Sequence, residues 1–192
     1  MNLPNKLTML RIVLAPVFLA VLYWGFPGAD YAALAIFIIA SLTDLLDGKI
    51  ARKYNLVTDF GKFADPLADK ILVVAALLWF VECGRTPAWM VMIVITREFA
   101  VSGLRMIASD NGRVIAAGWS GKVKTASTMA CIAVMLAMGP TIACHQSPAA
   151  VTAVPAGYFT WIDPLCGWII TLTTLYSGVE YFMKNKDVIR SA

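Results

Sequence analysis

Six long apolar segments, separated by shorter polar stretches, run along the whole chain. They comprise residues 7–24, 31–51, 63–81, 88–108, 118–138 and 158–183. Each is close to the length of about 20 apolar residues that a helix needs to cross a bilayer. Turn-forming residues follow the first segment, at Gly25, Pro27 and Gly28. The pattern predicts an all-α integral membrane protein with six transmembrane helices.

The composition supports one membrane domain over residues 1–192. Of these residues, 59% are hydrophobic and 15% are charged, and the mean hydropathy is +0.72, which excludes an ordinary soluble domain. We expect residues 1–6 to form an interfacial segment and residues 184–192 to form a basic cytoplasmic tail. The expected surroundings are therefore membrane lipids, and no nucleic-acid partner is expected.

The basic residues assign the helix ends to sides of the membrane. An even number of crossings puts both termini on the same side as the second and fourth loops. Those regions and the adjoining helix ends hold every Lys and Arg except Arg85 and the more deeply placed Arg97. Because Lys and Arg collect on the cytoplasmic side, we expect both termini to be cytoplasmic in a multi-pass protein of a bacterial cell membrane.

Five aspartates lie between residues 44 and 69, close to the predicted cytoplasmic ends of the second and third helices. On the second helix, two carboxylates and two minimal side chains lie within about 100° of the helix circumference. They are Asp44, Asp47, Gly48 and Ala51, and Arg52 borders the same face. On the third helix, Gly61, Asp65 and Asp69 recur every four residues and form one row about 80° wide. Thr58 or Asp59 is the expected cap of that helix, which separates Asp59 from the predicted site.

Four carboxylates brought to one point would repel one another strongly unless cations were bound between them. Oxygen ligands favour hard ions such as Mg²⁺ or Mn²⁺, and this number of carboxylates is enough to hold two ions about 4 Å apart. Such pairs of ions act on phosphoryl groups. The small residues Gly48, Ala51 and Gly61 would let a nucleotide or pyrophosphate approach the helix backbone. Asp69, the deepest carboxylate of its row, is the candidate proton acceptor.

Basic residues elsewhere in the chain have two interpretations. The fourth segment contains Arg97, Glu98 and Arg105: Glu98 either neutralises an arginine between helices, or the arginines present positive charge to an anionic substrate. In the fifth segment, Lys122 and Lys124 are about 200° apart, so we expect at most one to face a cavity. In the first segment, Arg11, one turn after Thr8, either extends to the interface or binds a phosphate. These basic residues and Thr8 are candidates for binding an anionic substrate.

The central stretch resembles the signature of the CDP-alcohol phosphotransferase family. It reads D-x-x-D-G-x-x-A-R, eight further residues, and G-x-x-x-D-x-x-x-D, and it matches at all eight positions: Asp44, Asp47, Gly48, Ala51, Arg52, Gly61, Asp65 and Asp69. Proteins of that family are six-helix membrane enzymes, commonly homodimers, that use two divalent metals to transfer a substituted phosphate from a CDP-linked donor to an alcohol. The resemblance therefore implies a homodimeric transferase with two Mg²⁺ or Mn²⁺ ions.

Three further runs, NLPNKLTMLRIVLAPVF, TREFAVSGLR and GKVKT, are similar to the branch of this family that uses CDP-diacylglycerol and glycerol 3-phosphate. By position, the resemblance makes Asp44, Asp47, Asp65 and Asp69 metal ligands, with Asp69 also the general base. It makes Gly48, Ala51, Arg52 and Gly61 part of the CDP site. Candidates for the acceptor's phosphate are Arg97, Arg105, Lys122 and Lys124, with Thr8 and Arg11 as additional site residues.

Other functions stay open from the residues alone. Within the family, serine, inositol or inositol phosphate would be alternative acceptors, and the basic residues favour one that carries its own phosphate. A cation transporter would also use aspartates within the membrane, but residues 31–40 and 71–80 offer no polar path for an ion. A purely structural scaffold leaves the clustered carboxylates unexplained.

Overall fold

The computed structural model describes residues 3–54, 59–110, 118–138 and 161–186, and of these it leaves undescribed the side chains of 3–7, 44–54, 59–67, 69 and 109–110. The described residues form helices and short turns, without strands. The helices are α1 (Leu3–Trp24), α2 (Ala29–Tyr54), α3 (Asp59–Glu82), α4 (Ala88–Asp110), α5 (Trp119–Met138) and α8 (Ile162–Lys184).

Each predicted apolar segment corresponds to one of these helices, so the all-α prediction is confirmed for the described residues. The largest differences lie at the polar ends. Helix α1 already begins at Leu3, within the segment expected to be interfacial, and α3 begins at Asp59, four residues before the predicted start. Helical hydrogen bonding continues into polar sequence once an apolar core has fixed the helix, which a hydropathy pattern does not register. The predicted start at residue 158 lies outside the described residues.

Membrane-spanning character is clear for fewer helices than the sequence predicts. Among the described residues, α5 alone is both long and apolar enough to cross a membrane, and the apolar stretches Thr8–Trp24 and Ala29–Thr43 are shorter. Helix α4 is long enough but carries Arg97, Glu98 and Arg105. The number of crossings and the sides of the termini therefore stay predictions.

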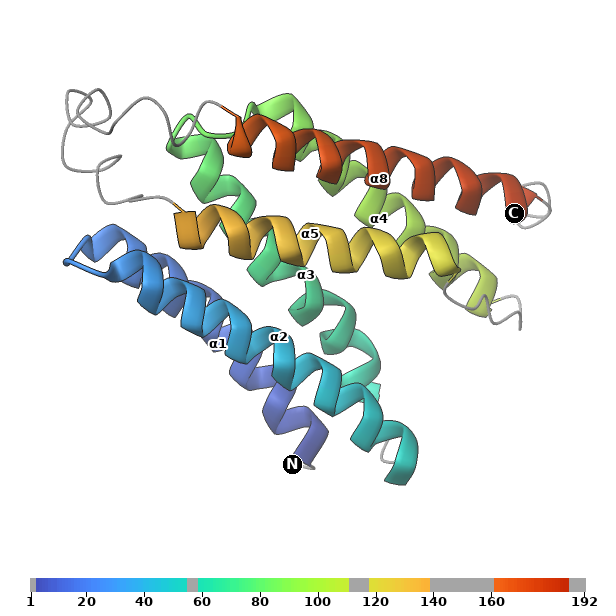
Figure 1. Cartoon of the computed structure of the whole chain (residues 1–192). Coiled ribbons are helices and arrows are strands. Elements are labelled where there is room, and N and C mark those ends of the chain that lie inside the picture. Colours follow the sequence, from blue (N-terminus) through green and yellow to red (C-terminus); the bar gives the residue numbers. More distant parts are fainter. Residues whose placement is uncertain (1–2, 55–58, 111–117, 139–160, 187–192) are drawn as a thin grey trace.

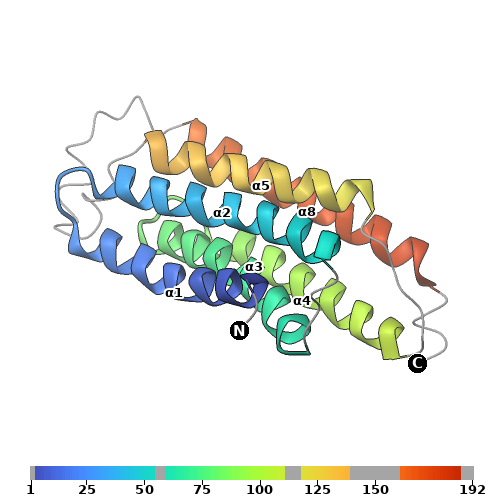
Figure 2. The same cartoon turned by 90° about the horizontal axis from the view of Figure 1, so that it is seen from below.

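The six helices form a bundle in which α1 packs against both α2 and α3, and α8 packs against both α4 and α5. Helix α5 also contacts α2 and α3 and so joins the two groups (Figure 1). The view from below shows the helices running in roughly the same direction, with α2 beside α5 and α1 on the outside (Figure 2). The core contains large, fully buried side chains from several helices, including Phe18, Phe37, Trp79, Phe80, Ile132 and Met135.

Glycines produce the turns that reverse the chain. Gly25 and Gly28 have φ values of 62° and 91° between α1 and α2, which confirms the predicted turn. At the end of α3, Gly84 has φ 67°; its N–H donates to the carbonyl of Val81 and the N–H of Arg85 donates to that of Phe80, both at 2.9 Å. This pair of bonds is a Schellman motif. It ends α3 and directs Arg85 back across the bundle.

Arg85 joins three helices at this end of the bundle. Its Nε and Nη2 donate to the two carboxylate oxygens of Asp163, at 2.8 and 2.7 Å, and Nη2 also donates to the carbonyl of Met135 at 2.9 Å. Asp163 is in the first turn of α8 and Met135 is in α5. Both charged side chains are almost fully buried, with 8% and 6% exposed. The pair therefore fixes the α3–α4 turn to α5 and α8.

We predict that Arg85→Met strongly destabilises the fold, because it leaves a buried carboxylate without its charged partner. The expected loss is about 3–5 kcal/mol in the free energy of unfolding, measured by denaturation in detergent micelles. Lys184→Met is the matched control, since Lys184 pairs with Glu180 on the surface and an exposed ion pair contributes little to stability. Equal losses in the two variants would contradict a structural role for the buried pair.

Candidate active site

The four aspartates of the signature lie on described helices, Asp44 and Asp47 on α2 and Asp65 and Asp69 on α3, but their side chains are outside those described. Their distances along the helix axis from the end of α2 and the start of α3 can still be counted. At 1.5 Å per residue, Asp47 is about 10 Å before the end of α2 and Asp65 about 9 Å after the start of α3. Asp44 and Asp69 are both about 15 Å from those ends. The two pairs are therefore matched in depth along their helices.

Thr8 and Arg11 lie at a similar depth on α1. Tyr23 donates a hydrogen bond to Glu82, and its ring packs on Trp79, which fixes the register of the parallel helices α1 and α3. Counting back from this contact brings Thr8 and Arg11 within about one turn of Asp65 and Asp69. Both side chains are buried, with 0% and 4% exposed. Arg11 therefore does not extend to the surface.

Glu98 is the centre of a partly buried charge network. Its carboxylate contacts Lys124 of α5, Arg97 at 3.2 Å between Nη1 and Oε1, and Lys70 of α3 at 3.8 Å between Nζ and Oε2. Lys70 also contacts Ser102 on α4. Three cationic side chains thus surround one carboxylate. Glu98 neutralises Arg97, as one of the two sequence interpretations expects, and positive charge remains in excess. That this charge serves an anionic substrate stays a prediction.

Arg97 extends this network to α8. Its Nη2 donates to Ser177 at 2.7 Å, and its side chain crosses α8 at Gly178, where an added Cβ would lie 3.2 Å from the Arg97 Cγ. Gly178 therefore makes room for the arginine. The Arg97 Nε–H is buried and has no hydrogen-bond partner among the described residues. This N–H is available to donate a hydrogen bond to an anionic oxygen in the bundle.

The two lysines of α5 differ as expected from their separation around the helix. Lys124 is buried, with 4% exposed, whereas Lys122 is exposed. Only Lys124 contacts Glu98. The prediction that at most one of them faces the interior is confirmed, and the structure identifies it as Lys124.

Arg105 does not join the network around Glu98. It is exposed, its Nε donates to the hydroxyl of Tyr181 at 3.3 Å, and its guanidinium lies 5.6 Å from the centre of that ring. Although Glu98 and Arg105 share one face of α4, they are about 10 Å apart along the axis. Among the predicted basic residues, the structure brings together Arg97 and Lys124 and leaves Arg105 and Lys122 outside.

Lys70 is the network member that sequence reasoning missed. It directly follows Asp69 in a segment that is otherwise apolar, and this lone cation was the available signal. Lys70 reaches α4, where it contacts Glu98 and Ser102. The network and the α3 aspartates are thus adjacent.

A metal centre is not visible in the side chains that the structure describes. Among them, no group of three or more His, Cys, Asp or Glu residues is arranged to hold an ion, and the four signature aspartates fall outside that set. Gly48, Ala51, Arg52 and Gly61 are also outside it. The donor set itself, four carboxylates at matched depths, has the oxygen ligands that Mg²⁺ or Mn²⁺ would need.

The chain is similar in sequence to several known proteins. The chain is 41% identical over 203 aligned residues to the CDP-diacylglycerol--glycerol-3-phosphate 3-phosphatidyltransferase of Bacillus subtilis (strain 168), covering 100% of this chain and 98% of that protein. It is 33% identical over 187 residues to the protein of the same name from Rickettsia bellii, with 96% of each covered. A probable phosphatidylglycerophosphate synthase of Mycobacterium tuberculosis is 45% identical over 127 residues, covering 65% of this chain and 60% of that protein.

The sequence profile of the CDP-alcohol phosphatidyltransferase family matches residues 1–176. This range includes the aspartates of α2 and α3 and the network around Glu98. A match over most of the chain, together with full-length relatives above 30% identity, shows the family. The chain therefore belongs to the CDP-alcohol phosphatidyltransferases and is an enzyme of that class.

Proposed function

We propose that this enzyme transfers the phosphatidyl group of CDP-diacylglycerol to glycerol 3-phosphate, giving phosphatidylglycerophosphate and CMP. The observation that carries the choice of acceptor is the excess of positive charge around Glu98, where Lys70, Arg97 and Lys124 meet one carboxylate. An acceptor with its own phosphate needs such charge, whereas serine or free inositol needs less of it. The names of the full-length relatives support the same acceptor.

In the proposed reaction, Asp69 takes the proton from the 1-hydroxyl of glycerol 3-phosphate. The hydroxyl oxygen forms a bond to the β-phosphorus of CDP-diacylglycerol while the bond from that phosphorus to the oxygen bridging to CMP breaks. Lys124, Lys70 and the unpartnered Nε–H of Arg97 hold the acceptor's phosphate. Arg52 and the small residues Gly48, Ala51 and Gly61 accommodate the CDP group.

We further propose that Asp44, Asp47, Asp65 and Asp69 hold two divalent cations, Mg²⁺ or Mn²⁺. When bound, such ions would neutralise charge on the phosphate oxygens and on the leaving group. Thr8 and Arg11, buried at the same depth on α1, would contribute a hydroxyl and a positive charge beside the same aspartates.

All six helices would span the membrane, with both termini and the aspartates towards the cytoplasm. The distribution of Lys and Arg supports this orientation, and α5 has the required length and hydropathy. Helices α4 and α8 would be accommodated in the membrane because Glu98 pairs with Lys70 and Lys124, and Asp163 pairs with Arg85. We propose that the protein is a homodimer in the cell membrane, as the family resemblance implies.

The assay that tests the proposed reaction offers each acceptor in turn. Purified protein with Mg²⁺ or Mn²⁺ and radiolabelled CDP-diacylglycerol receives glycerol 3-phosphate, serine, inositol or inositol phosphate, and the lipid product is identified by mass spectrometry. We expect phosphatidylglycerophosphate and CMP with glycerol 3-phosphate only. A product formed with serine or inositol instead would refute the proposed acceptor, while leaving the family assignment intact.

We predict that Asp69→Asn abolishes turnover but leaves binding of CDP-diacylglycerol measurable. The amide keeps the size of the side chain but cannot accept the hydroxyl proton at neutral pH. Single-turnover product formation and binding of labelled CDP-diacylglycerol are measured together. Asp59→Asn serves as control, because an asparagine still caps a helix; full activity of Asp69→Asn would remove that residue from the role of base.

We predict that Lys124→Met raises KM for glycerol 3-phosphate at least tenfold, because a charged hydrogen bond to a phosphate is worth about 1.5–3 kcal/mol. KM for CDP-diacylglycerol should change little. Lys122→Met removes the same charge from the exposed face and should leave both constants near wild type. Lys124→Arg, which retains the charge, should recover part of the affinity. Equal effects of the Lys122 and Lys124 substitutions would contradict the assignment.

A further inference from the structure

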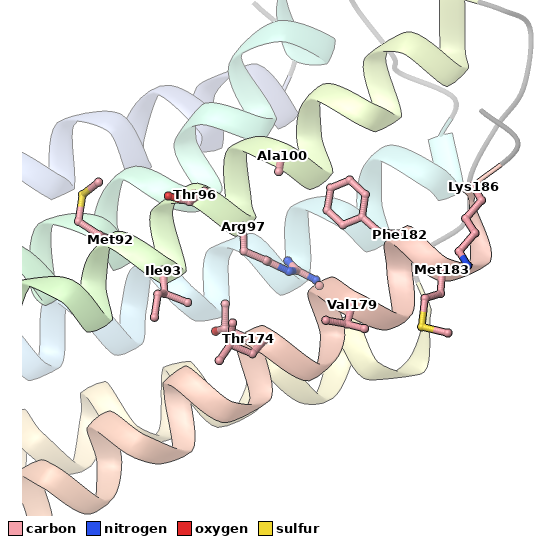
Figure 3. A pocket seen from close by; sticks show the side chains of 12 residues that line it. Met92, Ile93, Thr96, Arg97, Ala100, Thr174, Val179, Phe182, Met183 and Lys186 are labelled. Carbon is pink, nitrogen blue, oxygen red and sulfur yellow. The ribbon is translucent and has the colours of Figure 1, made fainter. Parts of the chain in front are cut away.

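A groove of about 710 Å³ lies between α4 and α8. Figure 3 shows the side chains that line it. Most of its lining side chains are apolar, and several are well exposed to solvent: the exposed fraction is 60% for Met92, 46% for Leu175 and 58% for Val179. A recessed apolar surface of this kind is suited to an apolar ligand.

The groove has the length of one bilayer leaflet. Its lining residues on α8 extend from Thr174, near the middle of the helix, to Lys186, just beyond its end. Twelve residues at 1.5 Å correspond to about 18 Å, and half of a hydrocarbon core about 30 Å thick is about 15 Å. Because α4 and α8 pack directly against each other, the furrow between them suits an extended chain better than a third helix about 10 Å across.

The charges at the groove are all positive. Among its lining residues only Arg97 and Lys186 are charged. Arg97 supplies its aliphatic stem to the floor and turns its guanidinium inward to Ser177 and Glu98 (Figure 3). Lys186 is exposed at the mouth, at the end of α8 where headgroups would lie. An apolar chain bearing an anionic group at one end matches this distribution.

We propose that the α4–α8 groove binds one acyl chain of an anionic phospholipid of the inner leaflet, whose phosphate is held by Lys186. This site is separate from the aspartates of α2 and α3, and it rests on the proposed orientation in the membrane. The bound chain covers the aliphatic stem of Arg97. The lipid acts here as a structural ligand and is not consumed.

Native mass spectrometry of delipidated protein tests the site, using phosphatidylglycerol and phosphatidylcholine with identical acyl chains. We expect one phosphatidylglycerol to bind about fivefold more tightly than phosphatidylcholine, the preference that one lysine near a phosphate provides. Lys186→Gln should abolish this preference. Lys184→Gln, which removes the same charge outside the groove, should keep it.

A second pair of variants tests the apolar part. Val179→Trp fills the groove and should remove binding of both lipids, whereas Leu172→Trp, which lies in another recess between α5 and α8, should not. Equal lipid binding in these two variants would overturn the proposal. A second result would also overturn it: the wild-type protein is a dimer without bound lipid, and Val179→Trp converts it to a monomer. The groove would then be an interface between copies. The lipid-binding experiments contain neither CDP-diacylglycerol nor an acceptor alcohol. A negative result in them is therefore distinct from a negative result in the transferase assay.

Discussion

A charged side chain inside an apolar bundle has to be compensated by partners within the protein, because neither lipid nor a packed core solvates it. The bundle meets this constraint at Glu98 by bringing Lys70, Arg97 and Lys124 to one carboxylate. These residues belong to three helices, and Arg97 reaches a fourth through Ser177. The need to pair the charges of these side chains therefore constrains how α3, α4, α5 and α8 are arranged. The same contacts leave positive charge next to the helix that carries Asp65 and Asp69.

Much of this arrangement could be predicted from local sequence patterns. Apolar runs bounded by residues such as Gly25 and Gly28 gave the six helices, because a helix of this length depends mainly on uninterrupted apolar residues. Helical periodicity predicted the different directions of Lys122 and Lys124. The row of Gly61, Asp65 and Asp69 stays a prediction, because these side chains lie outside those described. These features depend on positions within one helix, which the sequence contains in full.

The remaining features depend on contacts between helices. Periodicity separates Lys122 from Lys124 but does not say which one faces inward, since that depends on where Glu98 lies. Lys70 was overlooked because its partners are 28 and 32 residues away. Arg85 and Asp163 are 78 residues apart, and the pair forms only because Gly84 turns the chain towards α8. The directions of the aspartate side chains stay a prediction of the same kind.

The contacts that hold the helix ends together are unevenly distributed. Tyr23 with Glu82, and Arg85 with Asp163 and Met135, all lie where α1 and α3 end and α8 begins. From that end the α1–α2 pair and the helices α4, α5 and α8 diverge towards the end where α3 begins (Figure 1). Much of the conformational entropy of assembling the bundle is thus lost when the protein folds, before any substrate arrives. Such preorganisation lowers the entropic cost of binding any flexible ligand at the divergent end.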